Sequence, residues 1–481
     1  MAGSRARWID VPLYRVAIVC AAMLFALLGH ITLIQTFGSG SLNADRRNER
    51  PLIARYDHPR GDILTYDGTS VATSLPTGTG PYRYRRVYAH GEPYAAVTGH
   101  MSLYRSTGVE RALEAVLSGE DAKVKVRSLV RDGAVEGADV RLTVRDRVQQ
   151  AAYQGLRSTG VPGAAVAIDP ATGAILALAT YPAYDPNALA TLDPARLEAA
   201  AARLLSDPAK PLLNRALNRL YPPGSTFKLV TTAAALTSGE YTPSALVDAP
   251  ARLRLPGTSS YVRDGECGTA RPTLAYAFHL SCETAFAGIG LQLGPDLLRD
   301  QAEAFGFNAP ELRVPLPATS SRYPVARDRA QAALAAIGHQ DNRATPLMVA
   351  MLSAAVANDG VLMRPYLVEE VRLPDGSVIN RSAPARYRTA VRPGPARYLA
   401  AMMTVATEAE GSGAAIPGVR VAVKTATSSP AVPGAGQNAL ITAFAPAQAP
   451  EVAVGVVLER PGDRADAVTA IARAVIEAAL A

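Results

Sequence analysis

A single apolar segment near the N-terminus constrains this chain more than any other feature, because it decides in which solvent that part of the chain folds. Residues 16–37 are almost wholly apolar and are interrupted only mildly, by His30, Thr32 and Gln35. As a helix with a rise of ~1.5 Å per residue, the segment reaches about 30 Å and crosses a bilayer. A secretory signal peptide is the alternative, but its apolar core usually spans about 7–15 residues and ends in an A-x-A-like site, which is not found here. We therefore expect an uncleaved membrane anchor.

Charges on both sides of this anchor determine its orientation only weakly. Three arginines precede it and three follow it: Arg5, Arg7, Arg15, Arg46, Arg47 and Arg50. The excess of basic residues that marks a cytoplasmic flank is therefore small. We expect residues 1–15 to form a short cytoplasmic head and the bulk of the chain to lie on the extracytoplasmic side of the cell membrane.

The composition excludes several classes of function. At 481 residues the chain is too long for one core, and two or three domains are expected. The net charge of +7 comes from scattered residues, with no basic run and no interleaved aromatic residues, so nucleic-acid binding is not expected. The proximity of anionic lipid or wall polymer explains the net positive charge better. The six histidines do not cluster and no CxxC or HExxH pattern occurs, so we expect neither a metal nor a cofactor.

Lysine is rare in this chain, which makes its positions informative. Of the 49 basic residues only five are lysines: Lys123, Lys125, Lys210, Lys228 and Lys424. Arginine does not lose its proton in a protein, whereas a partly buried lysine can serve as a base. In a chain whose basic residues are nearly all arginine, each lysine is a candidate for a role that arginine cannot fill.

The order of the predicted elements indicates an α+β fold. Residues 38–160 consist of short strands and turns, with a hairpin signal at Asp67-Gly68. Two strands joined by a turn fill residues 163–180, and the stretch from 190 to 360 is helical in texture. Three strands and a final amphipathic helix follow, at 419–423, 439–444, 452–458 and 464–480. We expect a small strand-rich N-terminal domain and a second domain in which helices flank an antiparallel sheet.

The first motif with chemical meaning runs from Tyr221 to Lys228 with the sequence YPPGSTFK. Its prolines and glycine end a loop, and Ser225 opens an apolar helical stretch. The spacing of three places Lys228 on the same face one turn later, where a desolvated amine can activate the serine hydroxyl. The helix N-terminus adds positive charge where an oxyanion develops. Taken alone, however, an N-cap serine followed by a solvated lysine explains this pattern better.

Two further motifs follow in a fixed order. Ser281-Cys282-Glu283 opens a second helical stretch, and Lys424-Thr425-Ala426-Thr427 stands at the end of the predicted strand 419–423. Elements of the type S-x-x-K, S-x-N and K-T-G, the first two on helices and the third on a strand, are the signature of penicillin-binding proteins and related β-lactamases, which this chain resembles.

The resemblance extends over nearly the whole chain and favours the class B, monofunctional transpeptidase type. Segments typical of that class lie on both sides of the motifs, among them Arg60-Gly61-Asp62-Ile63, Gly108-Val109-Glu110, Asn214-Arg215-Ala216, Thr345-Pro346-Leu347 and Phe444-Ala445-Pro446. The resemblance implies an anchor at 16–37, a dimerisation or pedestal-like domain at 38–160 and a transpeptidase domain at 161–481. No glycosyltransferase-length domain precedes the last, which excludes the bifunctional class A type.

Carried over to this sequence, the resemblance implies a D,D-transpeptidase that cross-links peptidoglycan stem peptides and binds β-lactams covalently. Ser225 would form the acyl-enzyme, with Lys228 as the general base, while Ser281 relays protons. Lys424, Thr425 and Thr427 would hold the substrate carboxylate, and the backbone N–H groups of Ser225 and Thr427 would form the oxyanion hole. A membrane glycan polymerase of the cell-wall machinery is the implied protein partner.

The sequence departs from the family pattern at three positions. Glu283 replaces an asparagine, Ala426 replaces a glycine, and His339 stands where glutamine is frequent. A carboxylate at 283 would stabilise the charged form of the Lys228 ammonium and so slow acylation; a protonated or outward-turned Glu283 would have little effect. β-Lactam affinity is therefore expected to be low.

Two alternatives to an active transpeptidase remain. The chain could be a catalytically impaired scaffold of a cell-wall complex, or a β-lactamase or β-lactam sensor.

Cys267 and Cys282 are candidates for a disulfide. Both would lie outside the membrane, where disulfides persist, and bridging them would tether the segment that carries Ser281. Two separate buried thiols are the alternative.

Overall fold

The computed structural model describes residues 6–38, 50–78, 80–129, 136–264, 267–310, 312–326, 328–409, 413–428 and 436–481. The chain divides into two compact units, Met1–His58 with Gly78–Arg83 and Pro59–Thr77 with Tyr84–Ala481. Of the arginines that flank the expected anchor, Arg5, Arg46 and Arg47 lie outside the described residues.

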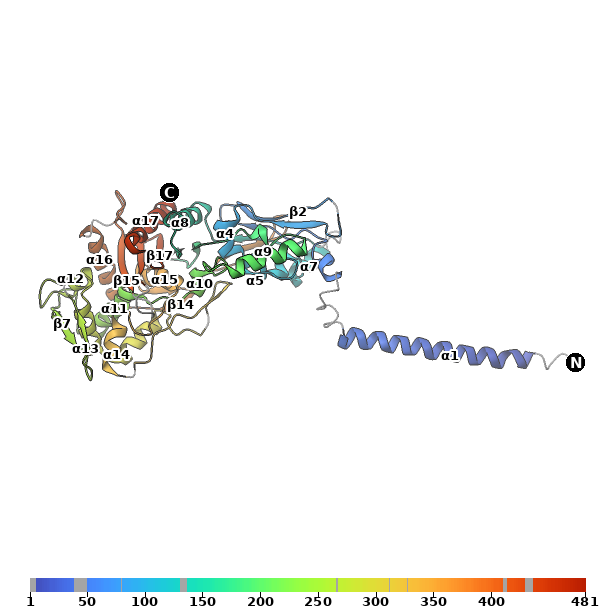
Figure 1. The fold of residues 1–481 in the computed structure, drawn as a ribbon, viewed down its shortest axis with the longest axis horizontal. Helices are drawn as coiled ribbons and strands as arrows, with labels where there is room; N and C mark the ends of the chain where they lie inside the picture. The colour runs from blue at the N-terminus through green and yellow to red at the C-terminus, as the bar shows by residue number, and fades with distance from the viewer. Residues whose placement is uncertain are drawn as a thin grey trace. The chain divides into compact units, whose positions relative to one another are not determined.

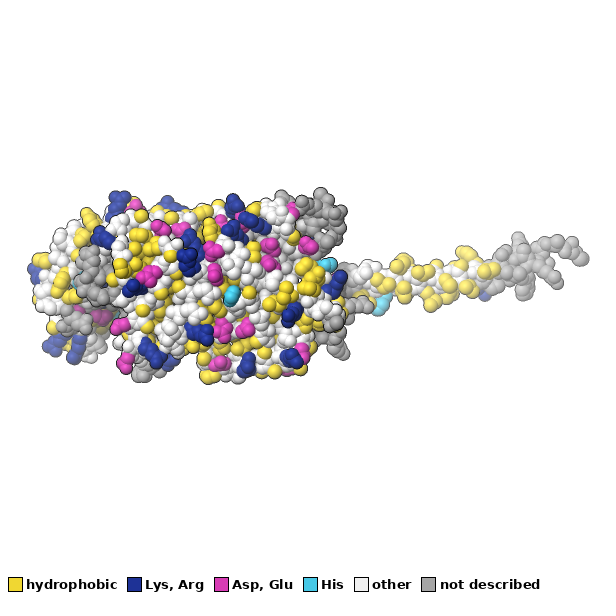
Figure 2. Space-filling model, turned by 90° about the horizontal axis from the view of Figure 1, so that it is seen from above, with side chains coloured by type: hydrophobic (Ala, Val, Ile, Leu, Met, Phe, Trp, Pro, Cys, Tyr) yellow, Lys and Arg dark blue, Asp and Glu magenta, His cyan; other side chains and the backbone are white. Residues whose placement is uncertain are grey.

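The first unit contains one long apolar helix. Helix α1 (Ala6–Leu33) continues into a π-helical turn, η1 (Ile34–Gly38). Within them, Leu13–Thr36 is long and apolar enough to cross a membrane, and none of it is buried in the protein. Figure 2 shows hydrophobic side chains along this helix. The Thr32 and Thr36 hydroxyls donate to carbonyls four residues earlier, at 2.8 and 2.7 Å, so the helix itself satisfies these polar atoms. A short helix, α3 (Arg50–Arg55), belongs to the same unit.

A six-stranded sheet organises the N-terminal part of the second unit. Its strands, in spatial order, are β13 (Val378–Arg381), β12 (Val368–Arg372), β4 (Asp139–Leu142), β1 (Ile63–Leu64), β2 (Ser70–Pro76) and β3 (Tyr84–Val87). Strands β1 and β2 form the hairpin that Asp67-Gly68 predicts, and Gly68 has the positive φ of 87° that such a turn requires. Strands β12 and β13 come from the far side of residue 160, so distant segments of the chain build this sheet together.

A buried ion cluster ties the helices of this region to the sheet. The region contains α4 (Gly91–Thr98), α5 (Gly108–Ala112), α6 (Glu114–Leu117) and α7 (Ala122–Leu129). Glu110 is fully buried and contacts Arg86 at 2.6 Å and Arg60 at 3.0 Å; Arg60 also reaches Glu114 at 2.8 Å. Burial by itself raises the pKa of the Glu110 carboxyl, but the two guanidinium groups outweigh it and hold that pKa below its usual value.

A second sheet has five strands, all antiparallel. In spatial order they are β15 (Ala422–Ser428), β16 (Asn438–Ala445), β17 (Val452–Leu458), β5 (Gly163–Ile168) and β6 (Ile175–Tyr181). Every residue of β16, β17 and β5 is buried, because helices cover both faces of the sheet. Helices α8 (Asp146–Thr159) and α17 (Ala467–Leu480) pack against it together, and α15 (Pro346–Ala357) packs separately (Figure 1).

One glycine permits the close approach of α15 to the sheet. A Cβ atom on Gly455 of β17 would lie 2.4 Å from the backbone nitrogen of Ala350 and 2.8 Å from the carbonyl oxygen of Pro346. No side chain fits there, so the strand and the helix meet backbone to backbone.

The remaining α-helices and strands belong to the same second unit. They are α9 (Pro194–Ser206), α10 (Arg215–Asn218), α11 (Lys228–Ser238), α12 (Leu274–His279), α13 (Glu283–Ala304), α14 (Arg329–Ala336), α16 (Pro393–Ala409), the hairpin strands β7 (Arg252–Arg254) and β8 (Tyr261–Arg263), and the short pairs β9 (Leu312–Arg313) with β10 (Pro317–Ala318) and β11 (Val361–Met363) with β14 (Arg386–Thr389). The α+β prediction, with helices flanking an antiparallel sheet, is therefore confirmed.

Candidate active site

Ser225 lies in a tight turn that glycine shapes. The turn η3 (Gly224–Phe227) is a 3₁₀-helix, and α11 begins only at Lys228. The sequence led us to place Ser225 at the start of the α-helix, but one 3₁₀ turn comes first. In a 3₁₀ turn residues three apart lie directly above one another, so Ser225 and Lys228 still share a face. Ser225 is 9% exposed and Lys228 is fully buried.

Two glycines let the backbone of this turn pack closely against two other segments. Gly224 has φ 51°, and a Cβ atom there would lie 2.6 Å from the carbonyl oxygen of Thr427 on β15. On its other side, a Cβ atom on Gly338 would lie 2.1 Å from the Gly224 carbonyl oxygen, and the Gly224 N–H donates to Gly338 at 3.3 Å. The serine turn is thus packed between β15 and the segment after α14.

Lys228 is confined by the second motif. Its ammonium donates to the backbone carbonyl of Ser281 and lies 5.6 Å from the ring centre of Phe286. The Glu283 Oε1 atom is 3.7 Å from the same Nζ atom. A carboxylate therefore faces the candidate base, as the sequence hypothesis requires.

The position of Glu283 at the start of a helix favours its negative charge. It is the first residue of α13, where the positive end of the helix dipole favours a negative charge. Its side chain is 35% exposed, and its Oε1 atom also lies 3.9 Å from Nε2 of His339. Glu283 and His339, two of the three positions at which we expect a departure from the family pattern, thus lie together, and Glu283 faces Lys228.

Ser281 joins the two lysines. Its carbonyl oxygen accepts from Lys228, and its hydroxyl oxygen accepts from Lys424. Lys424 is 2% exposed and lies 5.5 Å from the ring centre of Phe278, so both ammonium groups are buried and lie near aromatic rings. Because Lys424 donates to its oxygen, the Ser281 hydroxyl keeps its own proton available for another acceptor.

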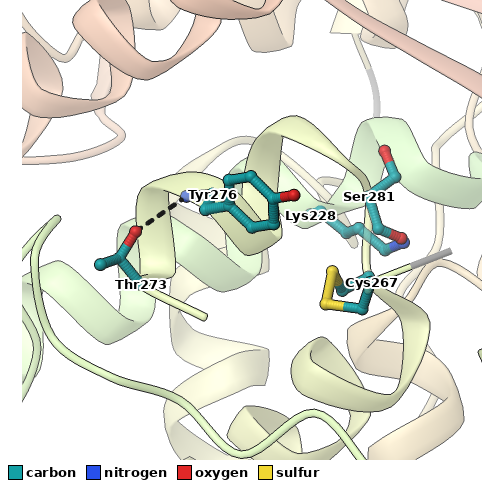
Figure 3. The surroundings of a disulfide bond; sticks show 6 residues. Lys228, Cys267, Thr273, Tyr276 and Ser281 are labelled. Carbon is teal, nitrogen blue, oxygen red and sulfur yellow. Dashed lines mark hydrogen bonds between the residues drawn. A yellow bond between two sulfur atoms is a disulfide. The ribbon is translucent and has the colours of Figure 1, made fainter. Parts of the chain in front are cut away.

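A disulfide fixes the backbone that carries Ser281. Ser281 has φ 57°, a left-handed conformation that a residue with a side chain adopts only when its surroundings hold it there. The next residue, Cys282, is bonded to Cys267, with the two Cα atoms 5.4 Å apart. Figure 3 shows the Lys228 side chain meeting the Ser281 segment beside this bridge.

The third motif lies within a strand rather than after one. Strand β15 begins at Ala422 and pairs with β16 through Ser428, so all of Lys424-Thr425-Ala426-Thr427 is hydrogen-bonded strand. The predicted strand at 419–423 was therefore placed too early, because the pairing with β16 and not the apolar alternation sets the boundary. Strand β15 is an edge strand among the described residues, and its open edge can pair with an extended peptide.

The motifs meet in one cleft of about 870 Å³. Its lining includes the candidate site residues Ser225, Ser281, Glu283, Thr425 and Thr427. Lys228 and Lys424 lie behind this lining, at the two sides of Ser281. The arrangement supplies a serine hydroxyl, an adjacent amine, a second hydroxyl and a cationic site beside an open strand edge, which is the set of groups that serine acyl transfer needs.

Sequence reasoning did not find several residues of this cleft. Arg263 and Asp264 line it from the end of β8, and Asp466 and Thr469 line it from the start of α17. None of them belongs to a recognisable motif, and only the folded chain brings them beside Ser225. Ala426 also lines the cleft and is 7% exposed, and its methyl lies 3.4 Å from where a Cβ atom on Gly224 would stand, so it is placed beside the serine turn.

Comparison with known proteins gives a consistent result. Residues 163–477 match the penicillin binding protein transpeptidase domain, and residues 60–140 match the penicillin binding protein A dimerisation domain. The peptidoglycan D,D-transpeptidases PbpA of Mycolicibacterium smegmatis and Mycobacterium tuberculosis are 41% and 40% identical to this chain, over 98% of it and 99% of their own length. Acyl-enzyme complexes of M. tuberculosis penicillin-binding protein A with ceftriaxone and with imipenem superpose with TM-scores of 0.86, at 40% identity, over 89% of this chain and all of theirs.

Proposed function

This chain belongs to the class B penicillin-binding proteins, the peptidoglycan D,D-transpeptidases, and we propose that Ser225 is the residue through which it transfers the acyl group. The observation that carries this assignment is the convergence at Ser281. One backbone carbonyl and one hydroxyl of the same residue bind the two buried lysines, next to a serine that lines the cleft. The scaffold, β-lactamase and sensor alternatives find no support among the relatives, which are named transpeptidases.

In the first half-reaction, Ser225 Oγ attacks the carbonyl carbon of the penultimate D-alanine of a donor stem peptide. Lys228, in its neutral form, takes the hydroxyl proton as the C–O bond forms. The oxyanion is held by the backbone N–H groups of Ser225 and Thr427. The peptide C–N bond then breaks, and the departing D-alanine amine receives a proton through the Ser281 hydroxyl, which Lys424 polarises.

In the second half-reaction, the amine of an acceptor stem peptide attacks the ester carbonyl. The C–O bond to Ser225 breaks, the amine gives up its proton to the same lysine–serine relay, and Ser225 regains its own. Lys424, Thr425 and Thr427 bind the terminal carboxylate of the donor before cleavage. An extended donor peptide pairs with the open edge of β15.

The setting of this reaction is part of the proposal. The apolar helix that contains Leu13–Thr36 anchors the protein in membrane lipid, with the residues before it cytoplasmic and the catalytic domain on the extracytoplasmic side. The Cys267–Cys282 disulfide supports that side, since such bonds persist in oxidising compartments. A membrane glycan polymerase supplies the uncross-linked strands, because the matched domains include none that polymerises glycan.

Covalent labelling tests the assignment of Ser225. The wild-type protein, incubated with a reactive β-lactam such as imipenem, should gain the mass of one ligand on the peptide that contains Ser225. Ser225→Ala should gain none, while the matched control Ser244→Ala, at an exposed serine in a loop after α11, should label like the wild type. Labelling of Ser225→Ala at another serine would overturn the assignment.

A further inference from the structure

A hairpin at the margin of the cleft carries arginines on one face. Strands β7 and β8 pair with Arg252 directly opposite Arg263 and Arg254 directly opposite Tyr261. All four side chains are exposed and share the outer face of this two-stranded ribbon. The residues between them, Leu253 and Val262, are partly or fully buried, and the hairpin packs against α13. We call Arg252, Arg254 and Arg263 the arginine face.

The arginine face forms no ion pair among the described residues around it, which end at Asp264 and resume at Cys267. In that part of the chain no carboxylate lies within ion-pair distance of Arg252, Arg254 or Arg263, whereas the nearby Arg271 is paired with Asp248. Arg252 lies 5.4 Å from the ring centre of Tyr261, and Arg254 donates to the Thr258 carbonyl at 3.2 Å. Like charges directly opposite each other destabilise a strand pair. The hairpin thus presents three positive charges whose mutual repulsion an anionic ligand would relieve.

The arginine face continues into the catalytic cleft. Arg263 lines the same cleft as Ser225. Immediately beyond the hairpin, Cys267 is bonded to Cys282, next to Ser281. The disulfide therefore fixes the base of the hairpin to the second motif, and a ligand on the arginine face would extend toward the serine from the side of α13 rather than along β15.

We propose that the arginine face binds the carboxylates of the acceptor peptidoglycan strand. This rests on the proposed function and assigns it a second subsite: β15 takes the donor, and the hairpin takes the acceptor. Guanidinium groups suit the task because their planar donors match carboxylates in pairs. Held there, the acceptor brings its amine to the Ser225 ester, where it forms the new amide bond as the ester bond breaks.

The partition of the acyl-enzyme between transfer and hydrolysis tests this subsite, because both outcomes consume the same intermediate. A thioester donor peptide would be offered with a stem-peptide acceptor that has free carboxylates, or with the same peptide amidated. In Arg252→Gln/Arg254→Gln the transfer-to-hydrolysis ratio should fall by about tenfold with the free acceptor and should not fall with the amidated one. The control Arg271→Gln, whose arginine is paired with Asp248 at 3.2 Å, should keep the wild-type ratio. An unchanged ratio in the double variant, or an equal fall with both acceptors, would refute the subsite.

A binding measurement separates failure of the subsite from failure of the proposed function. Absence of any acyl-enzyme in the wild type would count against Ser225 and leave the hairpin to be judged by binding alone. Fluorescently labelled acceptor strands should bind Ser225→Ala with an affinity that falls with salt. Adding Arg252→Gln/Arg254→Gln should weaken that binding about tenfold at low salt. Equal affinity with and without the two arginines would overturn the proposal whatever the fate of the serine.

Discussion

Replacing Glu283 should accelerate acylation, because its carboxylate faces the lysine that must act as a base. The Glu283 Oε1 and Lys228 Nζ atoms are 3.7 Å apart. Two unit charges at that distance attract by about 4 kcal/mol at an effective dielectric constant of ~20. Since Glu283 is 35% exposed, we take about half of this, ~2 kcal/mol, as the energy that favours the charged amine. Its loss corresponds to a gain of about 30-fold in the acylation rate at neutral pH.

Glu283→Gln is the cleanest perturbation, since it removes the charge and keeps the length of the side chain. Glu283→Asn would also remove the charge and would offer the ligand an amide N–H from a shorter side chain. The second-order rate of acylation by a fluorescent penicillin would be measured for both, from neutral to alkaline pH. The advantage of each variant should shrink as the pH rises, because the wild-type amine then becomes neutral as well.

A matched control uses another acid of the same helix. Glu303 lies at the far end of α13, outside the residues that line the cleft, and Glu303→Gln should react at the wild-type rate. If Glu283→Gln is folded and reacts no faster than the wild type, the reasoning is wrong. The carboxylate would then be engaged elsewhere, for which His339 at 3.9 Å is the nearest candidate in the described site.

Three further outcomes follow from the packing around the site. Gly224→Ala should lower acylation by about 100-fold, because its Cβ atom would stand 2.6 Å from the Thr427 carbonyl oxygen and displace the serine turn. Thiol titration of the unfolded, unreduced ectodomain should find neither Cys267 nor Cys282 free, and replacing both by serine should cost about 3 kcal/mol of unfolding free energy. Glu110→Gln should cost about 3–5 kcal/mol, seen as a fall in melting temperature, because it leaves buried guanidinium groups without their counter-charge.

The Gly224 and Glu110 variants each have a matched control. Gly239 also has a positive φ, 82°, but a Cβ atom there would meet nothing within 4 Å, so Gly239→Ala should leave acylation unchanged. Glu120 is exposed, and Glu120→Gln should melt like the wild type. The pKa of Glu110 is lower in the folded protein than in the unfolded chain. The ionised carboxylate therefore stabilises the fold at pH values above its unfolded-state pKa, and this stabilisation is lost as the pH falls through its folded-state pKa. The melting difference between Glu110→Gln and the wild type should accordingly narrow in acid; a constant difference would contradict the ion-cluster account.

The order of the motifs, read with the family resemblance, was enough to predict which residues the fold brings together. A serine and a lysine three residues apart, followed by Ser281 and then Lys424, identified four residues that the fold brings to a single cleft and its wall. The reason is that each motif is short and its chemistry is local. Glu283, two residues after Ser281 and the first residue of α13, likewise faces Lys228.

Non-local pairing accounts for what the sequence did not predict. Strands β12 and β13 join a sheet whose other members lie more than two hundred residues earlier, and no local pattern signals that pairing. The start of β15 depends on its register with β16, and the left-handed backbone of Ser281 depends on surroundings that only the folded chain provides. The arginine face was missed for a related reason: arginine is common in this chain, and only the register of β7 with β8 shows that Arg252 and Arg263 stand opposite each other.

The most direct test of the account is to observe the acyl-enzyme on its way to a cross-link. The wild-type protein would first be mixed with a donor stem peptide ending in D-alanyl-D-alanine, and an acceptor peptide would be added in a second step. Samples would be quenched rapidly and digested before and after the acceptor is added. The account predicts a Ser225 peptide heavier by the donor minus one D-alanine, which disappears as the cross-linked peptide forms at a matching rate. Cross-linked product from Ser225→Ala, or product that forms while no adduct on Ser225 ever accumulates or turns over, would contradict it.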